Sequence, residues 1–280
     1  MKIIDGKAIS NKIKEEITLK VSKMERKPGL AVILIGEDPA SMVYVSNKEK
    51  TCSKLGIKSF MYRLPDSTTE EELLLLIDEL NNNSEVDGIL LQHPVPNHID
   101  EMKAFNRISP DKDVDGFSVI NRGKLAIGED AFVACTPMGV IRMLKHENIE
   151  IAGKHCVIIG RSNIVGKPLY ELMLKENATV TICHSKTENL SEICKTADIL
   201  VAALGKPNFV TADMVKDEAI VIDVGINRVD GKLVGDVNFE DVSKKASLLT
   251  PVPGGVGPMT IAMLMENVIK AYEKKNMLNN

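Results

Sequence analysis

Hydrophobic positions along this 280-residue chain form two patterns, solid apolar runs and helical repeats. Leu30 to Ile35 is an uninterrupted apolar run, which is typical of a central parallel strand buried on both faces. Solid runs and apolar spacing among charged residues together predict the elements of the first third. The predicted strands are 30–35, 57–64 and 88–91, and the predicted helices are 8–26, 38–55 and 68–81. This order is β-α-β-α-β once the first helix is passed, which indicates an α/β layer structure.

Two of these helices carry start signals. Asp38 is placed to cap a helix whose first position is Pro39, and Gly56 is placed to end it. The threonines at 68–69 and the glutamates at 71–72 offer a capping box for the next helix.

The second part of the chain repeats the alternation. Turn-forming residues predict an irregular stretch over 107–135, and Thr136-Pro137 begins a helix that runs to about residue 145. The later predicted elements are strands at 156–160, 178–183, 198–203 and 219–224, a hairpin tip at 229–233, a rigid crossing over 250–258, and a helix at 259–274. We therefore expect two α/β lobes around a cleft, where small-molecule sites are commonly found.

Composition narrows the class of protein. Apolar residues make up 44% and charged residues 26% of the chain, as in soluble globular proteins. A formal net charge of −4 leaves no basic excess to neutralise nucleic-acid phosphates. Five cysteines without a CxxC pair disfavour zinc and disulfides, and they fit a reducing cytoplasm. No signal peptide and no apolar run of about 18 residues is present, so we expect a cytoplasmic protein without a membrane partner.

The turn from Gly160 to Gly166 is a candidate cofactor loop. An apolar strand ends at Gly160 and a helix is predicted to start near Gly166, so the free N–H groups of that helix would attract phosphate. The loop departs from the dinucleotide fingerprint G-x-G-x-x-G, because Ser162 and Val165 stand where glycines are expected. On these residues alone, an ordinary βα turn is as good an interpretation.

The end of the second strand of this lobe favours NADP over NAD. An NAD site places an acid about 20 residues after the glycine loop, to bind the ribose 2′-hydroxyl. Here Ser185 and Lys186 occupy the strand end, and Arg161 lies in the loop itself. A 2′-phosphate would meet donors at these positions. The alternative is that Arg161 and Lys186 are solvated surface charges.

In the first lobe, Ser41, Tyr44 and Lys48 recur on one helix. Tyr44 and Lys48, four residues apart, share a face. A lysine beside a phenol and partly withdrawn from water is a candidate acid/base, because its pKa can fall. From this segment alone, a solvated helix lysine is the commoner interpretation of Lys48. Cys52 continues the stripe and is interpreted as a packing residue.

Two further segments carry polar groups. Gln92 follows a predicted strand at the carboxyl edge where α/β sheets bind ligands, and its amide can both donate and accept. His93 lacks a partner in the sequence and is interpreted as a lining residue. Asp113 and Asp115 lie in a turn without metal-ligand companions. Asp115 either anchors the N–H donors of a heterocycle or belongs to an Asx turn.

Taken together, these segments resemble the bifunctional methylenetetrahydrofolate dehydrogenase/methenyltetrahydrofolate cyclohydrolase (FolD) family. The resemblance follows the family order, covers nearly the whole chain, and departs at His93, where many members have an apolar residue. The matching segments are Gly36-Glu-Asp-Pro-Ala-Ser41, Tyr44-Val-x-x-Lys48, Gln92-His-Pro-Val-Pro96, Asp113-Val-Asp-Gly-Phe117, Cys135-Thr-Pro137, Gly160-Arg-Ser-x-x-Val-Gly-x-Pro168 and Pro253-Gly-Gly-Val-Gly-Pro-Met-Thr260.

The resemblance implies a folate-binding catalytic domain (1–136 and 258–280), to which the C-terminal helix returns, and a Rossmann-like NADP-binding domain (137–257). It also implies a homodimer and tetrahydrofolate derivatives as substrates, which the enzyme oxidises with NADP and then hydrolyses. Lys48 would be the catalytic residue beside Tyr44, with Gln92 holding it and Asp115 anchoring the pterin. The implied NADP-binding positions are Gly160, Arg161, Ser162, Ser185 and Ile226.

Other classes fit less well. A short-chain dehydrogenase shares the Tyr44-x-x-x-Lys48 spacing, but its glycine loop comes before that pair. A shikimate-type dehydrogenase shares the domain order and lacks the Gln92-x-Pro-x-Pro segment. A nucleotide-sensing protein without turnover would not need Lys48, Gln92 and Asp115 together.

Overall fold

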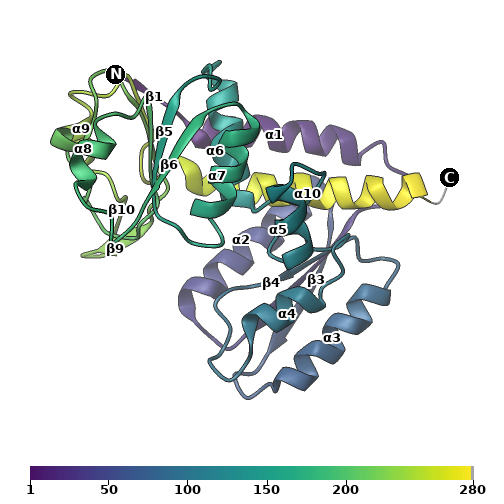
Figure 1. The fold of residues 1–280 in the computed structure, drawn as a ribbon. Helices are drawn as coiled ribbons and strands as arrows, with labels where there is room; N and C mark the ends of the chain where they lie inside the picture. Colours follow the sequence, from purple (N-terminus) through teal and green to yellow (C-terminus); the bar gives the residue numbers. More distant parts are fainter. Residues whose placement is uncertain (279–280) are drawn as a thin grey trace. The chain divides into compact units, whose positions relative to one another are not determined.

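The computed structural model describes residues 1–278 and divides into two compact units. Unit 1 comprises Met1–Asn11 and Ala134–Thr260, and unit 2 comprises Lys12–Val133 and the chain from Ile261 onward. Helices α1 (Gly6–Val21) and α10 (Val256–Leu278) each begin in unit 1 and continue into unit 2 (Figure 1). The predicted fold class is confirmed, including the return of the C-terminal helix to the first domain.

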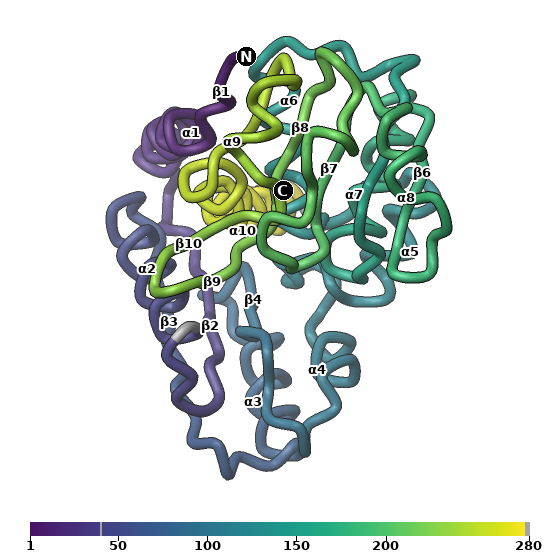
Figure 2. Tube along the Cα trace, turned by 90° about the vertical axis from the view of Figure 1, so that its left-hand side faces the viewer, coloured from purple at the N-terminus to yellow at the C-terminus, as the bar shows by residue number. Residues whose placement is uncertain are grey.

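Unit 2 is built on a parallel sheet with the strand order β3-β2-β4. Its strands are β2 (Gly29–Ile35), β3 (Lys58–Leu64) and β4 (Gly88–Leu91). All seven residues of β2 are buried, as the solid apolar run predicts. Figure 2 shows α2 (Pro39–Leu55) and α3 (Glu70–Asn82) on opposite sides of this sheet. Helix α4 (Glu101–Arg107) packs beside α3.

The predicted helix signals in unit 2 are confirmed. Asp38 accepts a hydrogen bond from Ser41 N at 2.7 Å, and Gly56 ends α2 in the left-handed region at φ 77°. Thr69 and Glu72 form a complete capping box at the start of α3.

Two predictions for unit 2 are wrong. The stretch 107–135 is not irregular throughout, because α5 (Val119–Ala126) forms within it. Ser118 caps α5, and the buried Asn121 donates to the Asp113 carboxylate at 2.9 Å, so the polar residues here pair with one another. The first helix was predicted to reach residue 26 but ends at Val21, since Arg26 turns away to bind Asp87.

Unit 1 contains a six-stranded sheet in the order β1-β11-β8-β7-β5-β6, with every pairing parallel. Its strands are β1 (Lys2–Ile3), β5 (His155–Ile159), β6 (Thr179–Cys183), β7 (Ile199–Ala202), β8 (Ile220–Asp223) and β11 (Leu248–Leu249). The four predicted strands are confirmed to within a residue or so at each end. The two-residue strands β1 and β11 are too short for a hydrophobic period to reveal. Pairing of β1 with β11 places the first residues of the chain in unit 1.

The helical segments of unit 1 are α6 (Cys135–His146), α7 (Gly166–Lys175), α8 (Leu190–Cys194), α9 (Phe239–Val242) and the 3₁₀ turn η1 (Ala212–Met214). Helix α7 packs against β5 and β6. The strands β9 (Asn227–Val229) and β10 (Lys232–Val234) form an antiparallel hairpin. Asp230 and Gly231 make its turn with positive φ angles of 48° and 78°, which confirms the predicted hairpin tip.

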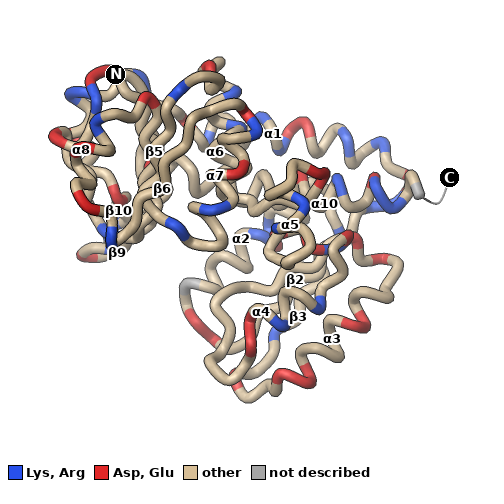
Figure 3. Tube along the Cα trace, in the orientation of Figure 1, with Lys and Arg blue, Asp and Glu red and all other residues tan. Residues whose placement is uncertain are grey.

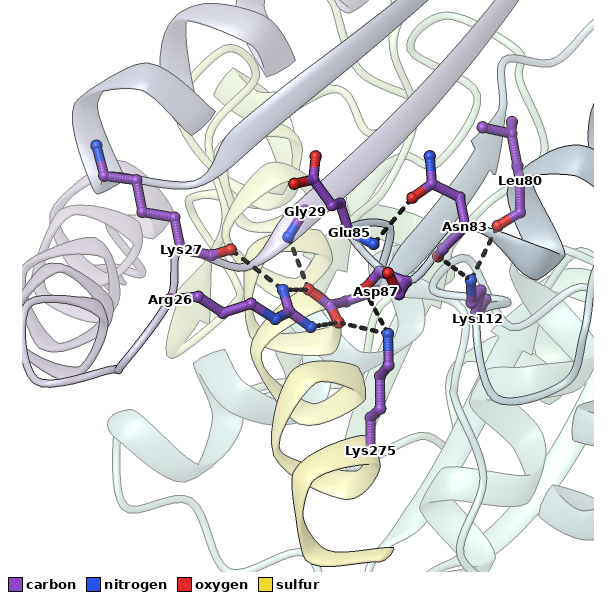
Figure 4. Close-up of polar contacts among 10 residues, drawn as sticks. Arg26, Lys27, Gly29, Leu80, Asn83, Glu85, Asp87, Lys112 and Lys275 are labelled. Carbon is purple, nitrogen blue, oxygen red and sulfur yellow. Dashed lines mark hydrogen bonds and ion pairs between the residues drawn. The ribbon is translucent and has the colours of Figure 1, made fainter. Parts of the chain in front are cut away.

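At the amino edge of the unit 2 sheet, Asp87 is a buried carboxylate surrounded by cations (Figure 4). Arg26 donates to both of its oxygens, at 2.8 and 2.5 Å, and Gly29 N donates at 2.8 Å. Lys275 of α10 lies 3.9 Å away. Asp87 therefore joins the start of β2 to the end of α10.

Lys112, drawn in the same view, binds the carboxyl end of α3 (Figure 4). Its Nζ donates to Leu80 O at 2.9 Å and to Asn83 O at 2.8 Å. Burial lowers the pKa of Lys112 to about 8.

Acidic and basic residues are interspersed along both units (Figure 3). Among the residues that the structure describes, no helix is long and apolar enough to cross a membrane.

Candidate functional site

Lys48 and Gln92 meet at the carboxyl edge of the unit 2 sheet. Lys48 lies on α2 and Gln92 follows β4, and Lys48 Nζ donates to Gln92 Oε1 at 2.9 Å. Gln92 Nε2 donates to its neighbouring carbonyl, His93 O, at 2.7 Å. Because that carbonyl can only accept, the amide group must turn its oxygen toward Lys48. Gln92 is 9% exposed, so a buried, oriented amide holds the lysine.

Tyr44 lies one helical turn before Lys48 and is 43% exposed. Its ring thus offers an accessible apolar face on the same side of α2. A cavity of about 820 Å³ flanks the same helix without including Lys48, Tyr44 or Gln92. It is lined by Leu34, Gly36, Glu37, Met42, Val45, Ser46, Arg63, Leu64, Pro65 and Asp66.

The two acids of the turn after β4 have different environments. Asp113 is buried, and its carboxylate accepts from Phe117 N, from Ser118 N and from the Asn121 amide. Asp113 is therefore the turn-forming acid. Asp115 is half-buried.

The side chain of His93 lies outside this arrangement, although the His93 carbonyl accepts from Gln92. Its side chain is exposed and pairs with Glu101 of α4. This surface contact with Glu101 accounts for the histidine better than the lining role suggested by the sequence.

In unit 1, the loop after β5 is closely packed. A Cβ at Gly160 would lie 2.1 Å from Ala203 O, and one at Gly166 would lie 2.0 Å from Gly160 O. Gly160 also has a φ of +132°, which side chains rarely adopt. Both glycines are required because β7 and the start of α7 approach the loop backbone directly.

The expectation that α7 points free N–H groups at a phosphate is not met. Ser162 Oγ accepts from Val165 N at 3.1 Å and from Gly166 N at 3.4 Å, and Ser162 O accepts from Lys167 N. Proline follows at 168 and has no N–H. The serine in place of the second fingerprint glycine thus caps the helix itself, and its hydroxyl proton stays able to donate elsewhere.

The remaining candidate cofactor residues are accessible along the same carboxyl edge. Arg161 and Ser185 are exposed, and Ile226 is 47% exposed. Residues 184–187, which follow β6, include no acid, and this turn is held by His184 N donating to Thr187 Oγ1 at 2.8 Å. Ser185 and Ile226 follow strands on opposite sides of β5. These donors and the glycine cradle fit a dinucleotide that crosses the sheet at its switch point and carries a 2′-phosphate.

Sequence patterns did not identify two buried acids of unit 1. Asp223 ends β8 and Asp236 follows β10, and both accept several backbone N–H groups at this edge. The sequence signal that could have identified them is a neighbouring glycine. Gly225 lies two residues after Asp223, and Gly235 directly precedes Asp236. Within residues 1–278, no group of three or more His, Cys, Asp or Glu side chains is arranged to hold a metal ion.

Comparisons with known proteins agree with these observations. A family model described as "Tetrahydrofolate dehydrogenase/cyclohydrolase, catalytic domain" matches residues 4–115, and the corresponding "NAD(P)-binding domain" model matches 134–276. The "Bifunctional protein FolD" of Halalkalibacterium halodurans is 58% identical over 275 residues, covering 97% of this chain and 99% of that protein.

Solved structures are also similar over nearly the whole chain. The bifunctional FolD enzyme of Campylobacter jejuni has a TM-score of 0.97 and 50% identity, covering 98% of this chain and 99% of that one. The FolD enzyme of Trypanosoma brucei, complexed with NADP cofactor and an inhibitor, has a TM-score of 0.93 and 37% identity, covering 98% and 97%.

Proposed function

The chain belongs to the tetrahydrofolate dehydrogenase/cyclohydrolase family, and we propose that it acts through Lys48 and Gln92 in unit 2 and a dinucleotide edge in unit 1. It is a bifunctional enzyme of one-carbon folate interconversion. It oxidises 5,10-methylenetetrahydrofolate to 5,10-methenyltetrahydrofolate with NADP, and hydrolyses that product to 10-formyltetrahydrofolate. The observation that carries the residue assignment is the Lys48–Gln92 hydrogen bond at a sheet edge.

The two steps require different groups. Oxidation removes a hydride from the carbon between N5 and N10, and NADP, when bound, supplies the acceptor. The nitrogens of the substrate donate electrons to the resulting cation, so this step needs positioning rather than a base. Hydrolysis adds water to that carbon and opens the ring, which requires proton transfers.

Lys48 is the residue that we assign to these proton transfers. Its bond to Gln92 Oε1 leaves the other positions on Nζ for water or substrate. Gln92 is itself held by His93 O, so the lysine is presented in one orientation. A solvated lysine would not be tied to a buried amide in this way.

Two further residues are assigned to the folate. Tyr44 lies on the same face of α2 as Lys48, and its exposed ring suits stacking against the pterin. Asp115 would accept N–H donors from the amino-pyrimidine edge of the pterin. Its support is that the neighbouring Asp113 already supplies the turn's structural carboxylate.

The NADP assignments follow the carboxyl edge of unit 1. Gly160 and Ser162 would lie near the pyrophosphate. Ile226 would lie toward the nicotinamide, because it follows a strand on the opposite side of β5 from Ser185. Arg161 and Ser185 would bind the 2′-phosphate, which distinguishes NADP from NAD. Their exposure and the absence of an acid from 184–187 support this assignment.

At the level of the whole chain, we propose a folate-binding domain of 1–136 with 258–280 and an NADP-binding domain of 137–257. Residues 1–11 pack with unit 1 but carry no assigned ligand contact. We also propose a cytoplasmic homodimer without a nucleic-acid or membrane partner. The cysteines are buried and form no disulfide, which supports a reducing compartment, and the interspersed acidic and basic residues support the lack of a nucleic-acid partner (Figure 3).

The test is an absorbance assay with 5,10-methylenetetrahydrofolate and either NADP or NAD. Reduced cofactor and methenyl product are followed separately, and the methenyl compound alone is then offered for hydrolysis. Both activities are expected, with NADP preferred. Hydrolysis without oxidation, or oxidation without hydrolysis, would contradict the bifunctional assignment.

A further inference from the structure

Asp236 is a fully buried carboxylate that binds two separate loops of unit 1. Its Oδ2 accepts from Leu204 N at 2.7 Å and from Gly205 N at 2.9 Å. Its Oδ1 accepts from Lys206 N at 2.8 Å and from the Asn227 side-chain amide at 2.9 Å. Three successive N–H groups after β7 and one amide after β8 therefore converge on one side chain.

Both bound loops lie at the carboxyl edge of the sheet, where the cofactor is assigned. Asn227 directly follows Ile226, the residue assigned to the nicotinamide side. Leu204 directly follows Ala203, whose carbonyl oxygen packs against the backbone of Gly160. Asp236 thus connects the Ile226 loop, through the loop after β7, to the glycine loop.

Asp223 holds Asp236 in place. Its carboxylate accepts from the N–H groups of Asp236, Val237 and Gly225, each at 2.9 Å. A Cβ at Gly225 would lie 2.3 Å from the Asp236 carboxyl carbon, so only glycine permits this approach. The two acids and the glycine therefore form one closely packed cluster, which a surface turn would not require.

We propose that Asp236 is a positioning residue for the dinucleotide, which sets the loops after β7 and β8 in the conformation that receives the nicotinamide half of NADP. This inference rests on the proposed function. An ionised carboxylate is the only side chain that accepts from all four N–H groups without donating to any of them. In asparagine, one of these oxygens is replaced by an NH₂ group. Whichever way the amide turns, its NH₂ then faces at least one backbone N–H, so that hydrogen bond is lost and the loop is released.

The test compares Asp236→Asn with wild type in three measurements. Binding of reduced cofactor, followed by its fluorescence, is expected to weaken about tenfold, and the KM for NADP is expected to rise by a similar factor. Hydrolysis of preformed methenyltetrahydrofolate, which consumes no cofactor, should stay within about twofold. A residue that only stabilised the fold would not separate cofactor binding from hydrolysis in a folded variant.

Asp198→Asn is the matched control. Asp198 also accepts a backbone N–H, from His155 at 2.9 Å, but at the amino edge of the same sheet. It should lose stability without a change in cofactor affinity. Asn227→Ala is the second variant, because it removes one bond of Asp236 from a partly exposed position. It is expected to weaken cofactor binding by about twofold to fivefold even if Asp236→Asn does not fold.

Cofactor affinity unchanged in folded Asp236→Asn, or in Asn227→Ala, would overturn the proposal. Equal losses of cofactor binding and hydrolysis would overturn it as well. A wild-type protein that binds no NADP, or lacks either activity, would instead contradict the proposed function.

Discussion

Unit 2 and unit 1 both bury aspartates against a parallel sheet, but at opposite edges and with different partners. Asp87 of unit 2 lies at the amino edge and is neutralised by Arg26 and Lys275. Asp236 of unit 1 lies at the carboxyl edge and is held mainly by backbone N–H groups. A carboxylate paired with cations joins elements, whereas one that binds successive N–H groups sets the conformation of loops.

The carboxyl edges of the two units also differ in the groups that form their polar sites. There the polar site consists of side chains, Lys48 from a helix and Gln92 from a strand end, that bind each other directly. In unit 1 the backbone of the glycine loop forms the cradle. The contrast matches the two tasks, since proton transfer needs a movable side chain and a dinucleotide needs a close backbone approach.

The largest effect is expected from Lys48→Ala. Loss of the group that transfers protons should lower the rate of methenyltetrahydrofolate hydrolysis by about 10²- to 10⁴-fold while NADP still binds. Lys50→Ala, an exposed lysine on the same helix, is the control and should retain activity. Wild-type hydrolysis by Lys48→Ala would show that unit 2 does not supply the proton at this residue.

Arg26→Ala tests whether the amino edge of unit 2 serves stability. Removing the arginine leaves the Asp87 charge buried with one distant lysine, and it should lower the free energy of unfolding by about 2–3 kcal/mol. Lys58→Ala is the control, because the Lys58–Glu85 pair is exposed on both sides and should matter little. Denaturant unfolding measures the free energy of unfolding of both variants. An equally small loss in the two would contradict the claim that the buried pair stabilises the fold more than the exposed one.

Asp223 makes a prediction about pH. Burial, more than the neighbouring Asp236, raises the pKa of Asp223 to about 6. Between about pH 4 and pH 6 the folded protein then binds more protons than the unfolded chain, so this group makes the free energy of unfolding fall as pH rises, by about 2 kcal/mol. Asp223→Asn should flatten that part of the stability profile. An unchanged profile would show that the carboxylate is ionised throughout this range.

The smallest effect is expected from Arg161→Ala. Losing one charge-assisted bond to a 2′-phosphate should raise the KM for NADP about tenfold and leave the KM for NAD nearly unchanged. Lys175→Ala, an exposed lysine at the end of α7, is the control. Parallel changes for both cofactors would indicate that Arg161 contributes general attraction and does not recognise the 2′-phosphate.

Much of the fold was readable from local patterns. The run Leu30–Ile35 predicts a strand buried on both faces, and the caps at Asp38 and Thr69 start helices where expected. These features depend on residues close in sequence. Three features that these patterns missed, namely β1, β11 and the end of α1 at Val21, are all decided by partners far along the chain.

The candidate site divides in the same way. Sequence alone singled out Lys48, Gln92, Asp115 and the glycine loop by residue type, position and resemblance. Only the tertiary structure brought Lys48 into hydrogen-bond contact with Gln92, 44 residues away. It also showed that Asp113 is the acid that forms the turn, and that Ser162 accepts from the N–H groups at the start of α7. It also revealed Asp236, whose three backbone donors precede it by 30 to 32 residues. Patterns encode local conformation and burial, whereas the pairing of buried polar groups depends on which distant segments the packed sheet brings together.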